Sequence, residues 1–193
     1  MVSAILPVPL SIDDYVKPMR KIHKGNAVRE VIRADKKGYT CEMFYQKNHL
    51  VDFVEINKSK EIRQGRKMTK SYQKDIEDYG GLPDEILQIK RSECLLHFSQ
   101  WMGVFKQIKG YKQGLLLVEK KLIGYINLIR HGDIILYGSI LGHGDYLNDG
   151  IMYLLNQKTV EWVMNLETPK EFRIKYIMYA GWFDGTDGLQ KWK

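Results

Sequence analysis

The last third of the chain contains the pattern that most restricts its fold. An apolar segment, residues 133–141, runs into the glycine-rich turn Gly142-His-Gly-Asp-Tyr146, and an amphipathic segment continues to about Asn165. A second apolar segment, residues 175–179, leads to another glycine-rich stretch. This order of strand, turn, helix, strand and turn points the unpaired N–H groups of a helix N-terminus at an anionic or carbonyl-bearing ligand. The pattern therefore predicts a transferase site.

Length and composition restrict the class of protein. A chain of 193 residues is long enough for one domain with a full core. No apolar run approaches the roughly 20 residues that a membrane span needs, and the N-terminus is a poor signal peptide, so we expect a cytoplasmic protein with no membrane partner. Cys41 and Cys94 provide neither a disulfide framework nor a metal-binding spacing. His97, His131 and His143 also lack the spacing of metal ligands, so we predict no metal site.

Positive charge is concentrated in one segment. The formal net charge is +7, and residues 57–74 carry seven basic residues against the single acidic residue Glu61. Within residues 59–79, Arg63, Lys67, Lys70 and Lys74 recur at helical steps, so we predict a helix with a basic stripe. The stripe is either a solvated helix face or a surface that follows a phosphate backbone. Arg63 and Arg66 would be the first contacts with nucleic acid.

Hydrophobic periodicity elsewhere predicts an α+β fold. Residues 11–24 and 27–37 are expected to be helices and residues 39–45 a strand, while residues 50–56 fit either. A strand at 95–105 is expected to begin the main sheet, followed by strands at 113–119, 121–130 and 134–141 in a meander. We therefore predict one domain, residues 1–193, with a helix-rich basic part at 1–90. Residues 91–193 would form a mixed, mostly antiparallel sheet flanked by helices, which holds the donor site.

Several motifs resemble those of the GNAT superfamily of acyltransferases, and most of all the Fem-type aminoacyltransferases. Val28-Arg-Glu-Val-Ile-Arg-Ala-Asp-Lys-Lys-Gly38 is similar to an Arg-x-x-Ile-x-Lys-Ala-x-Lys-x-Gly segment of the Fem-type proteins, and Gly188-Leu-Gln-Lys-Trp-Lys193 is similar to their closing helix. The signature that grips the coenzyme A pyrophosphate is absent. Asp145 and Asp149 stand in its place and would repel a pyrophosphate at close range.

The resemblance implies a GNAT-like fold and an enzyme that moves an acyl or aminoacyl group onto an amine. The donor would be aminoacyl-tRNA or acyl-CoA. The acceptor would be an amine on a small molecule, a peptide or a base in DNA, as in the GNAT-like enzymes of bacteriophages that modify DNA. The positive charge favours tRNA or DNA as a partner.

Three residues are candidates for catalysis. His143 is either a general base with a reference pKa near neutrality or a cap of its turn. Asp145 is either the N-cap of the helix or a carboxylate that binds the ammonium group of the acceptor. Tyr179, at the end of the second strand, is either a packing residue or the acid that protonates the leaving group, a role suggested by the resemblance.

Further residues are candidates for binding. We expect Gly142 and Gly144 to bring free N–H groups close to the donor carbonyl, as an oxyanion hole, with Ser139 and Asn148 beside them. Arg130, with Ser139 on the adjacent strand, either reaches across to a phosphate or carboxylate or is a solvated arginine at a strand end. Trp182 and Asp184 would bind a polar acceptor, unless the two Asp-Gly pairs are only turn residues.

The alternative function belongs to another class. The missing pyrophosphate signature favours a non-catalytic nucleic-acid-binding protein on a GNAT-like scaffold, whereas the His-Gly-Asp turn favours an enzyme. Likeness of fold alone does not establish chemistry.

Overall fold

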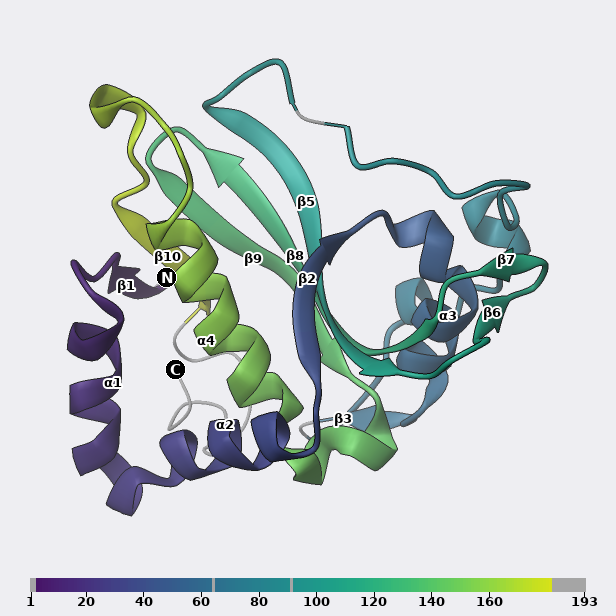
Figure 1. Cartoon of the computed structure of the whole chain (residues 1–193), viewed down its shortest axis with the longest axis horizontal. Coiled ribbons are helices and arrows are strands. Elements are labelled where there is room, and N and C mark those ends of the chain that lie inside the picture. Colours follow the sequence, from purple (N-terminus) through teal and green to yellow (C-terminus); the bar gives the residue numbers. More distant parts are fainter. Residues whose placement is uncertain (1–2, 64, 91, 182–193) are drawn as a thin grey trace.

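A six-stranded sheet forms the centre of this computed structural model, which describes residues 3–63, 65–90 and 92–181 (Figure 1). The strands β9 and β10 are parallel, and every other neighbouring pair is antiparallel. The expected α+β class and mixed, mostly antiparallel sheet are therefore confirmed. In spatial order the strands are β1 (Ser3–Pro7), β10 (Tyr176–Gly181), β9 (Ile134–Gly142), β8 (Lys120–His131), β5 (His97–Gln107) and β2 (Thr40–Phe44).

Helices cover both faces of the sheet. On one face α1 (Ile12–Lys21), α2 (Asn26–Lys36) and α4 (Ile151–Met164) enclose the larger core cluster, and on the other α3 (Leu50–Lys58) encloses a smaller cluster (Figure 1). Among the described residues, no helix has the length and apolar character needed to cross a bilayer. Short 3-10 helices complete the chain: η1 (Ile22–Gly25), η2 (Gln46–His49), η3 (Lys70–Tyr72), η4 (Glu77–Tyr79), η5 (Gly144–Asp149) and η6 (Lys170–Phe172).

Most of the elements expected from periodicity are present. The helices at 11–24 and 27–37 and the strands at 39–45, 95–105, 121–130, 134–141 and 175–179 are confirmed to within a few residues. The ambiguous segment 50–56 is helical, because the side chain of Gln113 caps its start: Oε1 accepts from the N–H groups of Val51 and Asp52 at 2.8 and 3.2 Å. The two edge strands, β1 and β2, come from the first 90 residues, so that part is not only helical.

The basic helix predicted at 59–79 is wrong. This segment contains a small hairpin of β3 (Ile62–Arg63) and β4 (Arg66–Lys67), followed by η3 and η4. Gly65 in the turn has φ of 74°, a conformation outside the helical region. The basic side chains therefore do not form a helical stripe.

The strand predicted at 113–119 is also wrong. The segment forms a separate hairpin of β6 (Lys112–Gln113) and β7 (Leu116–Leu117), with Gly114 at a φ of 59°. In the main sheet β8 pairs with β5 and β9 instead. The side chain of Gln113 points inward to cap α3, so this segment follows the helix and not the sheet.

The helix expected directly after the turn at 142–146 starts later. The 3-10 helix η5 intervenes, and α4 begins at Ile151 after Gly150, which has φ of 81°. A Cβ atom at Gly150 would overlap with the carbonyl group of Glu30 in α2. This close approach sets where α4 starts and how it crosses α2.

We predict that Gly150→Ala lowers the free energy of unfolding by about 3 kcal/mol or more. Strain at positive φ costs about 1–2 kcal/mol, and the overlap with Glu30 adds to it. Gly132→Ala is the matched control, because Gly132 has φ of 62° but no neighbour within 4 Å of its added Cβ. Urea denaturation measures both. Equal losses for the two variants would contradict the packing of α2 on Gly150.

Candidate functional site

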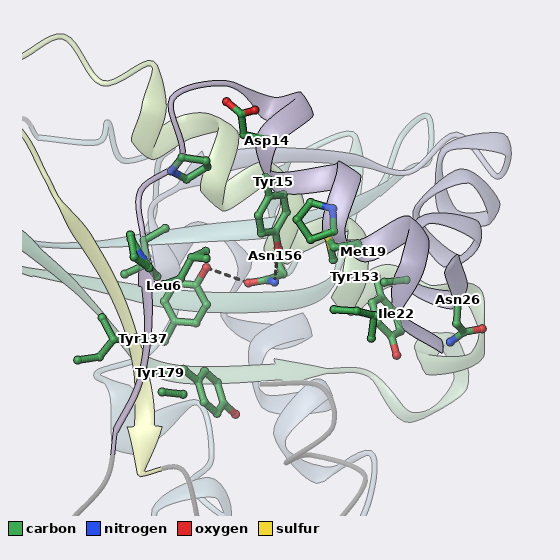
Figure 2. A pocket seen from close by; sticks show the side chains of 17 residues that line it. Leu6, Asp14, Tyr15, Met19, Ile22, Asn26, Tyr137, Tyr153, Asn156 and Tyr179 are labelled. Carbon is green, nitrogen blue, oxygen red and sulfur yellow. Dashed lines mark hydrogen bonds between the residues drawn. The ribbon is translucent and has the colours of Figure 1, made fainter. Parts of the chain in front are cut away.

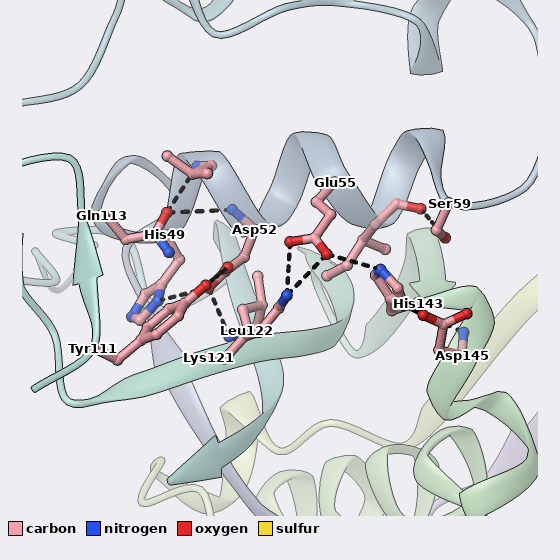
Figure 3. Close-up of polar contacts among 12 residues, drawn as sticks. His49, Asp52, Glu55, Ser59, Tyr111, Gln113, Lys121, Leu122, His143 and Asp145 are labelled. Carbon is pink, nitrogen blue, oxygen red and sulfur yellow. Dashed lines mark hydrogen bonds and ion pairs between the residues drawn. The ribbon is translucent and has the colours of Figure 1, made fainter. Parts of the chain in front are cut away.

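The turn at 142–146 has no free main-chain donors at its centre (Figure 3). The N–H of His143 donates to the Ile123 carbonyl at 2.8 Å, and that of Gly144 donates to Ser59 Oγ at 3.0 Å. The N–H of Asp145 donates to His143 Nδ1 at 3.2 Å. The predicted oxyanion cradle is therefore wrong at His143 and Gly144, because the first of these amides holds the turn on β8 and the second holds it on the end of α3.

The His143 ring has partners at both nitrogens. Nδ1 accepts the N–H of Asp145, and Nε2 lies 3.1 Å from Glu55 Oε1, an oxygen that also accepts from Lys121 Nζ at 2.8 Å (Figure 3). These contacts assign the proton to Nε2. The ring is buried and lines neither of the cavities described below. Its geometry favours the turn cap over the general base.

The prediction for Asp145 as a helix N-cap is wrong. His143, not Asp145, caps η5, and Gly150 occupies the N-cap position of α4. The Asp145 side chain is 88% exposed. It faces solvent and not a ligand cavity.

The two glycines of the turn allow close packing within the chain. A Cβ at Gly142 would lie 2.6 Å from Met152 Sδ, and one at Gly144 would lie 3.0 Å from the Ser59 carbonyl oxygen. Ser139 and Asn148 line neither cavity, and the Asn148 carbonyl accepts from Arg33 Nη1 at 2.9 Å. Of the four residues expected to contact the acyl donor, only Gly142 lines a cavity; Gly144, Ser139 and Asn148 do not.

Asp149 is turned toward α2. Its carboxylate accepts from Tyr39 Oη at 2.7 Å and forms an ion pair with Lys37. Burial alone would raise the pKa of Asp149, but the hydrogen bonds from Lys37 and Tyr39 outweigh it and lower this pKa. The expected repulsion of a pyrophosphate by Asp149 is thus weakened, because its charge is paired.

An opening lies where β9 and β10 diverge. Their parallel pairing ends at Tyr137 and Tyr179, whereas β9 stays paired with β8 as far as Gly142. The Gly142 carbonyl points away from β8 and accepts from Arg63 Nη1 at 2.9 Å. Because backbone groups alternate along a strand, the N–H and C=O of Ile140 point the same way. This edge of β9 therefore faces the opening with polar backbone groups.

A cavity of about 630 Å³ occupies this opening, and we call it the basic cleft. Its charged lining residues are all cationic within the described part of the chain: Lys60, Arg63 and Lys67. The edge of β9 and the side chain of Tyr179 form another wall. An anionic group is the ligand that such a lining favours.

Arg63 is the central cation of the basic cleft. Its guanidinium donates to the carbonyls of Gly142 and Ile56 and to Ser59 Oγ, each at 2.9 Å. All three acceptors are neutral, Nε is buried without a partner, and no carboxylate in the described residues pairs with this side chain. Burial lowers the pKa of Arg63. The cleft therefore holds a partly desolvated positive charge that no carboxylate in residues 3–63, 65–90 and 92–181 compensates.

A second cavity, of about 720 Å³, lies between β1, β10, α1 and α4 (Figure 2), and we call it the N-terminal cavity. It shares the side chains of Tyr153 and Tyr179 with the basic cleft, so the two adjoin. Tyr179 also packs edge-on against Tyr137, with ring centroids 6.0 Å apart. The predicted site residue Tyr179 thus stands between two cavities.

Arg130 does not form the predicted site with Ser139. It is buried and pairs across the sheet with Ile135, four positions before Ser139. Its guanidinium donates to the carbonyls of Gly132, at 2.9 Å, and Phe172. These contacts hold η6 on the β8–β9 hairpin, so its role is structural.

The other predicted binding residues have different outcomes. Lys67 lines the basic cleft, and Lys70 is exposed in η3 without lining either cavity. Arg66 lies in β4, and only its backbone position is described. Trp182 and Asp184 lie outside the described residues.

Sequence reasoning missed several residues of the two cavities. The charge of Lys60 is visible within the basic segment, but Ile140 and Tyr153 carry no local signal for a site. In the described part of the chain no three His, Cys, Asp or Glu side chains are grouped to hold a metal ion. No protein-family model matches this chain, and no curated protein is significantly similar to it. The cavities alone must indicate the chemistry.

We predict that His143→Ala lowers the free energy of unfolding by about 1–2 kcal/mol, because the N–H of Asp145 loses its acceptor and the carboxylate of Glu55 keeps only Lys121 as a partner. Asp145→Ala is the control and should change stability by no more than about 0.5 kcal/mol, since its side chain is exposed. Chemical denaturation at neutral pH measures both. Unchanged stability of His143→Ala would contradict a structural role for this histidine.

Proposed function

We propose that this chain is a cytoplasmic acyl- or aminoacyltransferase with a GNAT-like fold, and that it holds the carrier of its acyl group in the basic cleft. One observation carries the proposal: the parallel strands β9 and β10, joined through α4, diverge after the Tyr137–Tyr179 pair and open onto a cationic cavity. A polar strand edge, positive charge and a tyrosine hydroxyl at one opening are parts that acyl transfer needs.

The edge of β9 replaces the turn at 143–145 as the source of oxyanion donors. The N–H groups of Ile140 and Gly142 point toward the opening, on the side where β10 no longer pairs with β9. In the proposed reaction the amine nitrogen bonds to the acyl carbon, and the bond from that carbon to the oxygen or sulfur of the carrier breaks. Tyr179 donates a proton to the leaving atom, and the amine supplies the proton that restores the tyrosine.

The charge of the cleft favours an anionic carrier. Arg63 is held in place by its three hydrogen bonds before any ligand arrives, so little side-chain entropy is lost when an anion binds. Lys60 and Lys67, which are exposed to solvent and also line the basic cleft, add further positive charge to it. Acyl-CoA and aminoacyl-tRNA both carry phosphate groups and an activated acyl group, and both fit this description.

The test uses ligand-induced thermal stabilisation. We expect acyl-CoA or aminoacyl-tRNA to raise the melting temperature, and Arg63→Met to weaken that ligand by about tenfold or more, because the variant cannot donate a charge-assisted hydrogen bond. Arg63→Lys keeps the charge and should retain part of the affinity. Lys70→Met is the control in the acyl-CoA measurement, because Lys70 does not line the cleft. Equal losses for Arg63→Met and Lys70→Met would contradict an anion site at Arg63.

A non-catalytic nucleic-acid-binding protein is the second candidate. The occupied amides at 143–145 favour it, as do the exposed side chains of Lys60, Lys67 and Lys70 on one segment. Stabilisation by duplex DNA alone, without any by acyl-CoA or aminoacyl-tRNA, would select this candidate over the enzyme.

For either candidate, the triple variant in which Ala replaces Arg63, Lys67 and Lys70 should show a weaker salt dependence of nucleic-acid binding. The slope of the logarithm of the binding constant against the logarithm of the salt concentration should decrease in magnitude by up to about 0.9 for each phosphate that is no longer neutralised. Fluorescence anisotropy at several salt concentrations measures this slope. An unaltered slope would show that these side chains face only water.

A further inference from the structure

The N-terminal cavity has apolar walls whose polar groups largely satisfy one another. Tyr137 donates to Asn156 Oδ1, and Asn156 Nδ2 donates to Tyr15 Oη, each at 2.9 Å (Figure 2). Burial raises the pKa of Tyr15 to about 12, so its hydroxyl stays neutral at physiological pH. Leu6, Met19 and Ile177 line much of the remaining wall. A ligand with an apolar body fits such a cavity, because few wall groups need a polar partner.

The two adjoining cavities carry opposite charge. Among the described residues that line the N-terminal cavity, Asp14 is the only charged one, whereas those of the basic cleft are Lys60, Arg63 and Lys67. Figure 2 shows Asp14 at one end of the N-terminal cavity and Tyr179 at the other. Asp14 is exposed and its Oδ2 accepts from Ser11 Oγ at 2.7 Å, which leaves its negative charge in place. Such a carboxylate attracts a cation and repels an anion. The basic cleft therefore favours an anionic ligand, and the N-terminal cavity favours a cationic one.

We propose that the N-terminal cavity binds the acceptor, and that this acceptor is a small primary amine on an apolar body. The assignment as acceptor rests on the proposed transferase function, whereas the binding of such an amine does not. The amine would enter as an ammonium ion past Asp14, place its apolar body against Leu6, Met19 and Ile177, and meet the acyl group at Tyr179. There it gives one proton to solvent water, and its neutral nitrogen then attacks the acyl carbon.

Isothermal titration of the full chain tests the site with three probes of similar size: 3-phenylpropylamine, 3-phenylpropan-1-ol and 3-phenylpropanoate. At neutral pH we expect the amine to bind about tenfold more tightly than the carboxylate, with the alcohol between them. Asp14→Asn should weaken the amine by about threefold, as expected for an exposed charge, and leave the alcohol unchanged. Asp13→Asn is the control, because Asp13 is also exposed but does not line the cavity.

A second pair of variants locates the binding. Ile22→Trp should fill the cavity from its rim and weaken all three probes by about tenfold or more. Ile32→Trp should change nothing, because Ile32 is 47% exposed, comparable with 55% for Ile22, but lies outside the cavity. The proposal is overturned if no probe binds, if the carboxylate binds as well as the amine, or if each control variant acts like its partner.

The two proposals fail in different ways. Amine binding that Ile22→Trp abolishes, in a chain that transfers no acyl group, would leave the amine site standing and remove the transferase function. Acyl transfer to an amine that Ile22→Trp and Asp14→Asn leave unchanged would keep the transferase function and remove the amine site.

Discussion

The Arg63 guanidinium connects the elements on which the candidate site depends. Through Ile56 and Ser59 it holds the end of α3, and through Gly142 it holds the end of β9. These contacts join residues up to 79 positions apart in the sequence. The same group supplies positive charge to the basic cleft, because the oxygens that accept its hydrogen bonds are neutral. The Arg63 side chain thus holds α3 against β9 and also gives the basic cleft its partly buried positive charge.

This connection explains why the turn after β9 is not an open cradle. Ser59 accepts from Arg63 and also from the N–H of Gly144, and His143 is held against Glu55 of α3. The turn therefore uses its amides to fix α3 against the sheet. The N–H groups that point toward a cavity are those of Ile140 and Gly142 in β9. In this part of β9 the pairing with β10 has ended.

Local periodicity was enough to predict most helices and strands. In α2, α4 and β9, for example, the spacing of apolar residues within the segment indicates the element. It failed for residues 59–79, where basic residues recur at helical steps but the conformation depends on Gly65 and on the distant partner of Arg63. It failed again at Gln113, whose side chain serves α3 and not a strand.

The candidate site could be predicted only in part. The sequence indicated Tyr179, Lys67 and the importance of Arg63, because charge and strand ends are visible locally. It could not indicate the N-terminal cavity, because that cavity requires β1 to pair with β10, and this pairing joins segments from opposite ends of the sequence. It also could not show that the amides beside His143 would find partners on other elements.

The most direct test of the central claim is amide NMR during titration with inorganic pyrophosphate. An anion held in the basic cleft by Arg63 and the edge of β9 should shift the Ile140 and Gly142 amide signals, and Arg63→Met should abolish those shifts. Shifts confined to the amides of residues 143–145, or shifts at Ile140 and Gly142 that survive Arg63→Met, would contradict the account.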